Sequence, residues 1–158
     1  MLTEREAAVL LAATKDALAR AGAMGGSVGM PFGSLGAERA GAVGGRFGAR
    51  FTRPRTVVRT LEVEHGVGVV RDSARRAIAA HGAEIADPNG GGDGAVWGIV
   101  ASGSFDMVPA LVRVATEPRA TGGSRVHLRA TGREGLIKQR IAEKAIERLG
   151  AAIEGGRP

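Results

Sequence analysis

Three histidines are the residues of this sequence best suited to bind a metal ion or to move a proton. His65, His81 and His127 fall at a predicted strand end, a predicted helix end and the middle of a predicted strand. None has a second histidine three or four residues away, and the chain contains no cysteine, so disulfides and thiolate chemistry are excluded. We therefore predict structural histidines and no metal site.

Two glycine-rich stretches and one serine-containing stretch resemble functional motifs, but each motif is incomplete. Gly66 and Gly68 precede a predicted helix, yet Arg71 stands where the dinucleotide pattern requires a third glycine. The segment 88–94 (PNGGGDG) is a single short copy, which is typical of a hairpin loop rather than of a calcium site. The segment 102–106 (SGSFD) lacks the G-x-S-x-G pattern of a serine nucleophile. The sequence therefore predicts no catalytic residue and no cofactor.

A cluster of arginines is the strongest candidate for contact with an anionic partner. Beside Phe47 and Phe51 the chain places five arginines: Arg46, Arg50, Arg53, Arg55 and Arg59. Such a cluster is typical of a segment that binds acidic lipids at a membrane, or of an arm that binds nucleic acid. It is equally typical of a solvated joint between a helix and a domain. Aromatic residues are only 3% of the chain, which removes most stacking surfaces for single strands and makes nucleic acid the less favoured partner.

Small residues recur at every fourth position from residue 13 to residue 49. Positions four apart share one face of an α-helix, so the pattern predicts a groove that lets a second helix approach closely. The predicted helix-packing residues are Gly25, Gly29, Gly33, Gly41 and Gly45. Ten glycines between positions 22 and 48, together with Pro31, would destabilise a lone helix in water. The segment is therefore either a linker or a helix that forms against a partner helix or lipid, and the strict period favours the helix.

The same segment contains an uncharged window, residues 21–37, whose 17 residues are at the short limit for crossing a bilayer. Few of its side chains are strongly apolar, so lying at a membrane interface or in a bundle is favoured over spanning. The opening residues, MLTEREAAVLL, carry acids where a signal peptide carries Lys or Arg. We therefore expect a cytoplasmic protein that associates peripherally with the inner face of the cell membrane, and its net charge of +6 suits an anionic surface.

The N-terminal helix is predicted by a capping-box spacing and by helical periodicity. Thr3 and Glu6 can each satisfy the other's free backbone N–H, and the apolar spacing that follows predicts a helix over residues 4–20. After residue 51 the glycine-rich composition gives way to alternating apolar and polar residues. We therefore divide the chain into a glycine-rich helical arm, residues 1–51, and an α+β domain, residues 52–158.

The domain is predicted to contain five strands and two helices in the order β-α-β-β-β-β-α. Alternating residues predict a strand from residue 56, and a helix over 67–80 follows that Gly82 ends and whose inward face is Val70, Ala74, Ala77 and Ile78. Further strands are predicted over 83–86, 95–102, 109–117 and 125–131. The last helix is predicted to start near Glu134, with an apolar stripe of Ile137, Ile141, Ala145, Leu149 and Ile153. This order predicts an antiparallel sheet covered on one face by two helices.

Two resemblances accompany these patterns. The span from Thr56 to Ile153, in which RVHLRATG runs into REGLIKQRIAEKAIERL, resembles small uncharacterised α+β domains of bacteria rich in Gly, Ala and Arg. Some of those domains are grouped with ligand-binding helix-grip proteins, although this chain is shorter than the full helix-grip pattern. The layout of a glycine-rich arm ahead of a domain of about a hundred residues is similar to the small scaffold subunit that tethers actinobacterial high-affinity uptake hydrogenases to the membrane. That resemblance implies arms that assemble into a tube and a subunit that carries quinone.

These features together predict a non-catalytic accessory or scaffold protein. Its arm would self-associate near a membrane, and its α+β domain would dock a partner protein within a larger complex. One alternative is a nucleic-acid-binding module that uses the cluster from Arg46 to Arg59. The other is a small carrier of a hydrophobic ligand such as a lipid or quinone, which rests on fold analogy alone.

Overall fold

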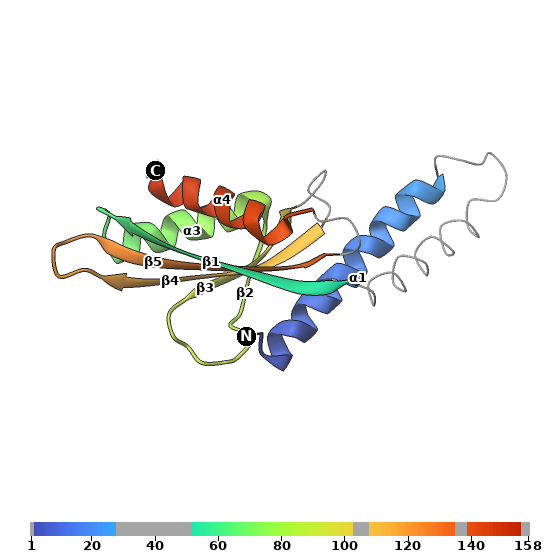
Figure 1. The fold of residues 1–158 in the computed structure, drawn as a ribbon, viewed down its shortest axis with the longest axis horizontal. Helices are drawn as coiled ribbons and strands as arrows, with labels where there is room; N and C mark the ends of the chain where they lie inside the picture. Colours follow the sequence, from blue (N-terminus) through green and yellow to red (C-terminus); the bar gives the residue numbers. More distant parts are fainter. Residues whose placement is uncertain (1, 28–51, 103–107, 135–138, 156–158) are drawn as a thin grey trace.

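The computed structural model describes residues 2–27, 52–102, 108–134 and 139–155. An N-terminal helix precedes a five-stranded antiparallel sheet and two further helices (Figure 1). In chain order the elements are α1 (Glu4–Ser27), β1 (Arg53–Val63), α3 (Val67–His81), β2 (Gly82–Ile85), β3 (Val96–Ser102), β4 (Val108–Pro118), β5 (Ser124–Glu134) and α4 (Ile141–Glu154). The predicted α+β fold and its order of strands and helices are confirmed.

The strands are arranged in the order β1-β5-β4-β3-β2, and each pairs antiparallel with its neighbours. Strand β5 pairs with β1 along its whole length and with β4 from Gly132 to Ser124. The turn between β4 and β5 contains Gly122 and Gly123 with φ of 90° and 75°. Residues with a side chain rarely adopt such positive φ values, so the two glycines are what lets these long strands turn tightly.

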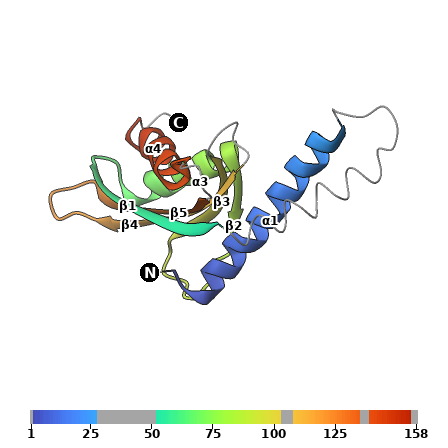
Figure 2. The ribbon, with the colours of Figure 1, turned by 45° about the vertical axis from the view of Figure 1, so that its right-hand side comes forward.

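Helices α3 and α4 cover one face of the sheet, as predicted (Figure 2). Alternate residues of β5 point into this core, where Val126, Leu128 and Ala130 are fully buried. The buried residues of the two helices recur with helical spacing: Val70, Ser73, Ala74, Ala77, Ile78, Ile141, Ala142, Ala145, Ile146, Leu149, Gly150 and Ile153. The inward faces predicted for both helices are thus confirmed at every described position, while Ile137 lies outside the described residues.

The start of the last helix was predicted wrongly. Strand β5 continues to Glu134, which pairs with Arg53 at the start of β1, and α4 begins only at Ile141. The reason is that β1 starts three residues earlier than its alternation predicts, so its pairing prolongs β5. The Glu134 side chain then accepts a hydrogen bond from the backbone N–H of Ile141 at 3.1 Å, so a strand residue caps the helix.

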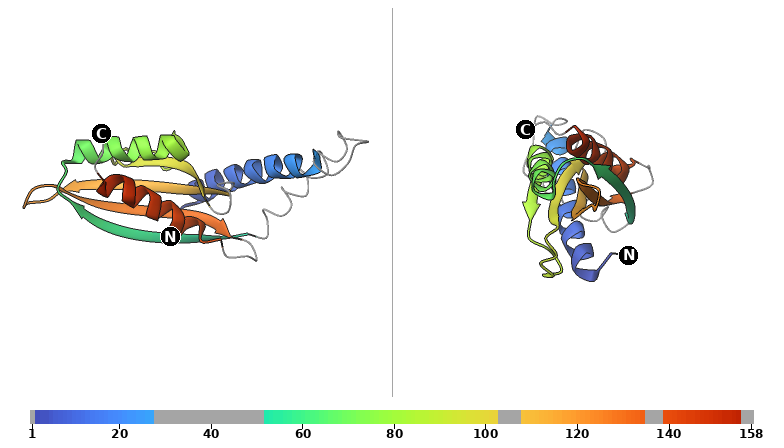
Figure 3. Two further views of the ribbon diagram at one scale, coloured as in Figure 1. Left: turned by 90° about the horizontal axis from the view of Figure 1, so that it is seen from above. Right: turned by 90° about the vertical axis from the view of Figure 1, so that its left-hand side faces the viewer.

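Helix α1 lies against the other face of the sheet, which the predicted arrangement left uncovered. Its Leu10 is fully buried against Trp97 of β3 and Leu111 of β4. The first half of the helix crosses the sheet and the second half extends beyond it (Figure 3). The helix runs to Ser27, past its predicted end near residue 20. Whether residues 52–158 fold without it stays a prediction.

The start of α1 confirms the predicted capping box. The backbone N–H of Glu6 donates to Thr3 Oγ1 at 3.2 Å, and the backbone N–H of Thr3 donates to Glu6 Oε2 at 3.1 Å. The helices within the described ranges all fall short of the length and apolarity needed to cross a membrane.

The packing of α3 on β3 predicts opposite effects for two Gly→Ala substitutions. A Cβ at Gly98 would overlap Cγ2 of Ile78 and lie 3.0 Å from the carbonyl oxygen of Ala83, whereas a Cβ at Gly68 would meet nothing within 4 Å. We expect Gly98→Ala to lower the free energy of unfolding by about 1–3 kcal/mol. Gly68→Ala, in an exposed turn of α3, should raise it by about 0.5–1 kcal/mol. Urea denaturation measures both, and a neutral Gly98→Ala would contradict this packing.

Candidate functional site

The arginine cluster is only partly within the described residues. Arg46 and Arg50 lie outside them, whereas Arg53, Arg55 and Arg59 belong to β1. These three share one strand face because they are separated by even numbers of residues. The structure therefore brings three of the five predicted contact residues together, on the side of the sheet that α3 and α4 cover.

Two of these arginines are engaged by acidic side chains of the same chain. Arg55 Nη2 lies 2.7 Å from Glu143 Oε1, and its Nη1 lies 3.8 Å from the Oε2 of Glu134, the residue that caps α4. Arg59 Nη2 lies 3.2 Å from Glu154 Oε1, near the end of α4. The positive charges of Arg55 and Arg59 therefore fasten α4 to β1, which leaves them less suited to an external anion.

The predicted helix-packing glycines can be located at one position. Gly25 lies in the last turns of α1. Gly29, Gly33, Gly41 and Gly45 lie outside the described residues. The packing role of all five stays a prediction.

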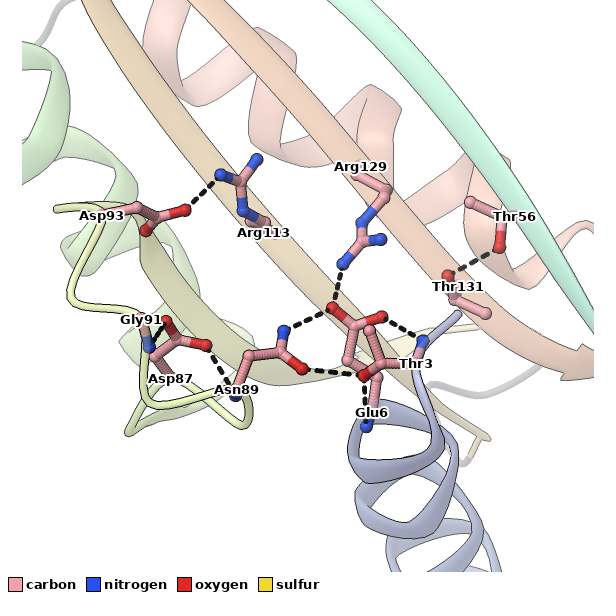
Figure 4. Close-up of polar contacts among 10 residues, drawn as sticks. All are labelled: Thr3, Glu6, Thr56, Asp87, Asn89, Gly91, Asp93, Arg113, Arg129 and Thr131. Atoms are coloured by element: carbon pink, nitrogen blue, oxygen red, sulfur yellow. Dashed lines mark hydrogen bonds and ion pairs between the residues drawn. The ribbon is translucent and has the colours of Figure 1, made fainter. Parts of the chain in front are cut away.

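A polar cluster that the sequence analysis did not predict joins α1 to the sheet. We call Thr3, Glu6, Asn89 and Arg129 the Glu6 cluster (Figure 4). Glu6 is only 1% exposed, and its Oε1 accepts hydrogen bonds from Arg129 and from Asn89 Nδ2, the latter at 3.0 Å. Thr3 Oγ1 donates to Asn89 Oδ1 at 2.8 Å. One carboxylate thus ties together α1, the loop between β2 and β3, and strand β5.

The loop that supplies Asn89 is held by its own polar contacts. Asp87 accepts hydrogen bonds from the backbone N–H groups of Asn89 at 2.8 Å and Gly91 at 2.9 Å (Figure 4). Asp93 accepts hydrogen bonds from Arg113 of β4 and from the backbone N–H of Ala95. The predicted hairpin loop is confirmed, because it connects the antiparallel strands β2 and β3. The two side chains considered for calcium, Asn89 and Asp93, are engaged by protein groups.

The single tryptophan lies beside this cluster, beneath two cations. Arg113 and Arg129 have their guanidinium carbons 5.7 Å and 5.4 Å from the centroid of the Trp97 ring. Both distances suit cation–π attraction. Trp97 is 2% exposed, and its indole N–H lies buried with no hydrogen-bond partner in the described part of the chain. Packing and the two guanidinium groups, each held by a carboxylate, therefore fix the ring.

The two carboxylates of this region are stabilised in their charged forms. Burial alone raises the pKa of Glu6, but hydrogen bonds from Arg129, the Thr3 backbone and Asn89 outweigh burial and lower that pKa below its ordinary value. The hydrogen bond from Arg113, with that from the Ala95 backbone, lowers the pKa of Asp93. Because Glu6 accepts several hydrogen bonds and is hardly exposed, it is suited to holding α1 on the sheet rather than to transferring a proton to a substrate.

The histidines occupy three separate places. His127 on β5 has its ring nitrogens 3.2 Å from Thr60 Oγ1 and 3.4 Å from Glu117 Oε1. His65 follows β1 and His81 ends α3. No group of three or more His, Asp or Glu that could hold a metal ion occurs among the described residues.

A shallow apolar hollow lies between α3, α4 and the end of β3. It is partly open to solvent and encloses no room for even a water molecule, and its lining consists of Ala77, His81, Val100, Ala101, Ala145, Arg148 and Leu149. Pockets that hold small ligands usually measure about 300–1,000 Å³. The hollow is smaller than that range, because the helix side of the sheet is filled by the side chains of the core.

Sequence patterns held only weak signals of the Glu6 cluster. Glu6 was explained locally by its capping box, and Arg113 and Arg129 look like ordinary polar positions of half-buried strands. Arg113 and Arg129 are opposite each other in the β4–β5 register, and Trp97 is opposite Arg113. The one usable signal was the only tryptophan of the chain, which falls on β3, since β4 beside it and β5 beyond β4 each present an arginine on the same face.

Comparisons with known proteins supply no functional assignment. No family model matches the chain, and no curated protein matches it. Three chains of solved structures match. One is an uncharacterized protein from Rhizobium leguminosarum, with a TM-score of 0.42 and 13% identity, covering 66% of this chain and 95% of that one. The class established for this protein is therefore the α+β fold described above.

The Glu6 cluster predicts a loss of stability in acid. Because the pKa of Glu6 is lower in the folded chain than its ordinary value of 4.5, the ionised carboxylate stabilises the folded state. This contribution is complete above that ordinary value and disappears as the pH falls through the lowered folded pKa. We expect Glu6→Gln to lower the free energy of unfolding at pH 7 by about 1–3 kcal/mol, since Arg129 loses its anionic partner.

Urea titrations of the native protein and of Glu6→Gln between pH 7 and pH 3 measure this effect. The difference between the two proteins should shrink toward the acid end. The same titration of Glu4→Gln, whose side chain is exposed, provides the matched control. A constant difference across the pH range would contradict the role given to the Glu6 charge.

The contacts of Arg55 predict that it contributes to stability whereas Arg53 does not. Arg55→Gln would leave the carboxylates of Glu134 and Glu143, which are 9% and 14% exposed, without their cation. We expect a loss of about 1 kcal/mol in unfolding free energy, limited by the exposure of Arg55 itself. Arg53→Gln, at an exposed position, should change it by less than about 0.5 kcal/mol. Equal values for the two variants in urea denaturation would show that Arg55 does not fasten α4.

Proposed function

We propose that this protein is a non-catalytic accessory or scaffold protein. Its glycine-rich arm self-associates, and its α+β domain docks a partner protein. The observation that carries the proposal is the placement of α1, whose first half packs on the sheet while its second half extends beyond it (Figures 1 and 3). A helix held in this way gives any assembly of arms a fixed connection to the domain.

The fully buried face of α1 and the small-residue stripe lie on neighbouring sides of the helix. The residues of α1 that are buried against the sheet are Glu6, Leu10 and Thr14, spaced four apart. The stripe that includes Ala17 and Gly25 is one residue out of step with them, which is about 100° around the helix. Ala13 and Ala17 of the stripe are only half-buried, and a second helix packed on this face would cover the surface that the sheet leaves open, which supports a role of the stripe in helix packing.

A membrane surface is the site we propose for this assembly. Arg46, Arg50 and Arg53 would supply charge to an anionic surface, since the other two arginines of the cluster are paired with glutamates. The same pairing would leave a nucleic-acid-binding module only these three arginines for phosphate contacts, and the low aromatic content keeps it the less favoured alternative. The small size of the apolar hollow gives little support to a lipid or quinone carrier. A larger protein complex is the partner we propose, in line with the layout shared with hydrogenase-tethering subunits.

The packing role of the stripe predicts that bulky residues on it disrupt assembly. Gly29→Leu combined with Gly41→Leu should reduce the mass of the assembly that the full-length protein forms, although leucine is the better helix former. Gly36→Leu combined with Gly44→Leu is the matched control, because both positions are outside the four-residue period. Light scattering, with and without acidic lipid vesicles, measures the mass. A linker would tolerate both pairs equally, and that result, or a native protein that is monomeric in both conditions, would refute the proposal.

A further inference from the structure

Strand β1 presents a long free edge. It stands at one end of the sheet and pairs with β5 on one side only, within the part of the chain that the structure describes. About every second one of its eleven residues directs its backbone N–H and C=O groups to the other side. Long free edges pair readily with other strands unless they are protected. The opposite edge of the sheet, β2, has only four residues and offers little for pairing.

The middle of β1 lacks the usual protection of an edge. Pro54 and Arg55, near its start, are residues that discourage pairing. At its midpoint, by contrast, Val58 is 63% exposed, more than Val69 of α3 at 50%. Thr56 and Thr60 flank Val58 on the same strand face and are also exposed. This uncharged, β-branched row is suited to packing beside another strand.

We propose that β1 pairs antiparallel with β1 of a second copy of this chain, about a two-fold axis at Val58. The axis at Val58 lets all eleven residues of the two strands overlap, because Val58 is the midpoint of Arg53–Val63. Val58 then faces Val58 of the second copy, and Thr56 faces its Thr60. Two five-stranded sheets become one continuous sheet. The β1 edges of both copies are then used, so no further copy can add at β1 and the pair is closed.

The charges of β1 disfavour the adjacent register. With the axis at Val58, Arg55 lies opposite Leu61 of the second copy and Arg59 lies opposite its Val57. Moving the axis one residue, to Val57, would set Arg55 directly opposite Arg59 in two places, which is destabilising. Even in the favoured register, Arg59 is a diagonal neighbour of both Arg55 and Arg59 of the second copy. Their pairing with the glutamates of α4 compensates that charge.

This interface goes beyond the proposed function, because it uses the sheet rather than the glycine-rich arm. A scaffold with both surfaces would join copies pairwise through the sheet and further through the arm. The two surfaces are separable by mutation, since Val58 is an exposed strand residue and the stripe lies elsewhere in the sequence.

The absence of cysteine from the sequence makes the register directly testable. In Val58→Cys, the two thiols would be on directly opposed residues, whose Cβ atoms lie about 4.5–5.5 Å apart and can approach to disulfide geometry. Glu62→Cys is on the same strand face but would lie about 27 Å from its symmetry mate, eight residues along the pair. Val69→Cys, on α3, controls for collisions of exposed thiols.

The experiment is mild oxidation of the full-length variants followed by non-reducing electrophoresis. We expect Val58→Cys to form mostly disulfide-linked dimer at micromolar concentration, while Glu62→Cys and Val69→Cys remain mostly uncrosslinked. Equal crosslinking of all three variants, or no excess for Val58→Cys, would overturn the proposal. These outcomes do not depend on whether the arm assembles.

A second measurement uses Val58→Asp, which would set two carboxylates opposite each other at the axis. Because Val58 is exposed, the variant should fold, and its circular dichroism and urea midpoint check this. In the Gly29→Leu/Gly41→Leu background, sedimentation should give a dimer that Val58→Asp converts to a monomer, a twofold fall in mass. A monomer before Val58→Asp is introduced, or a mass unaffected by it, would overturn the pairing.

Discussion

The two-sided pairing of β5 is the constraint on which the rest of this structure depends. The strand pairs with β1 on one side and β4 on the other, so its register sets that of both neighbours. Its alternate residues serve two different interiors, since Leu128 is buried beneath α3 and α4 while Arg129 holds α1 on the opposite face. A slip of one residue would exchange these faces, placing a guanidinium in the apolar core. Each face therefore enforces the register that the other requires.

The docking of α1 follows from the same register. Burying the Glu6 carboxylate carries a desolvation penalty, which hydrogen bonds from Arg129, Asn89 and the Thr3 backbone offset. Leu10 adds apolar contact one turn further along the helix, against Trp97. The helix is thus fixed to the sheet through its first half by a charged group and an apolar group together. The division at residue 51 was based on composition alone. In the structure the start of the arm, helix α1, packs on the sheet of the α+β domain.

The part of this sheet face beyond α1 carries a network of charges. Arg125 of β5 lies 3.2 Å from Glu62 of β1 and 3.4 Å from Glu117 of β4, and these contacts raise its pKa. Glu117 also contacts His127 at 3.4 Å, and Glu62 contacts Arg119 at 3.0 Å. Cross-strand pairs of opposite charge are the usual solution for a sheet face exposed to water. Residue types that could do chemistry are therefore occupied here in holding neighbouring strands together.

The sequence by itself determined the elements whose cause is local. The helical spacing of Val70, Ala74 and Ile78 identified the buried face of α3, and the Thr3–Glu6 spacing identified the start of α1, because the residues concerned lie within a few turns of one another. Only the tertiary structure decided the start of α4, which depends on how far β1 prolongs β5. It alone decided the role of Glu6, whose partners Asn89 and Arg129 lie 83 and 123 residues away. No local period records such contacts, since they exist only once the sheet has brought distant segments together.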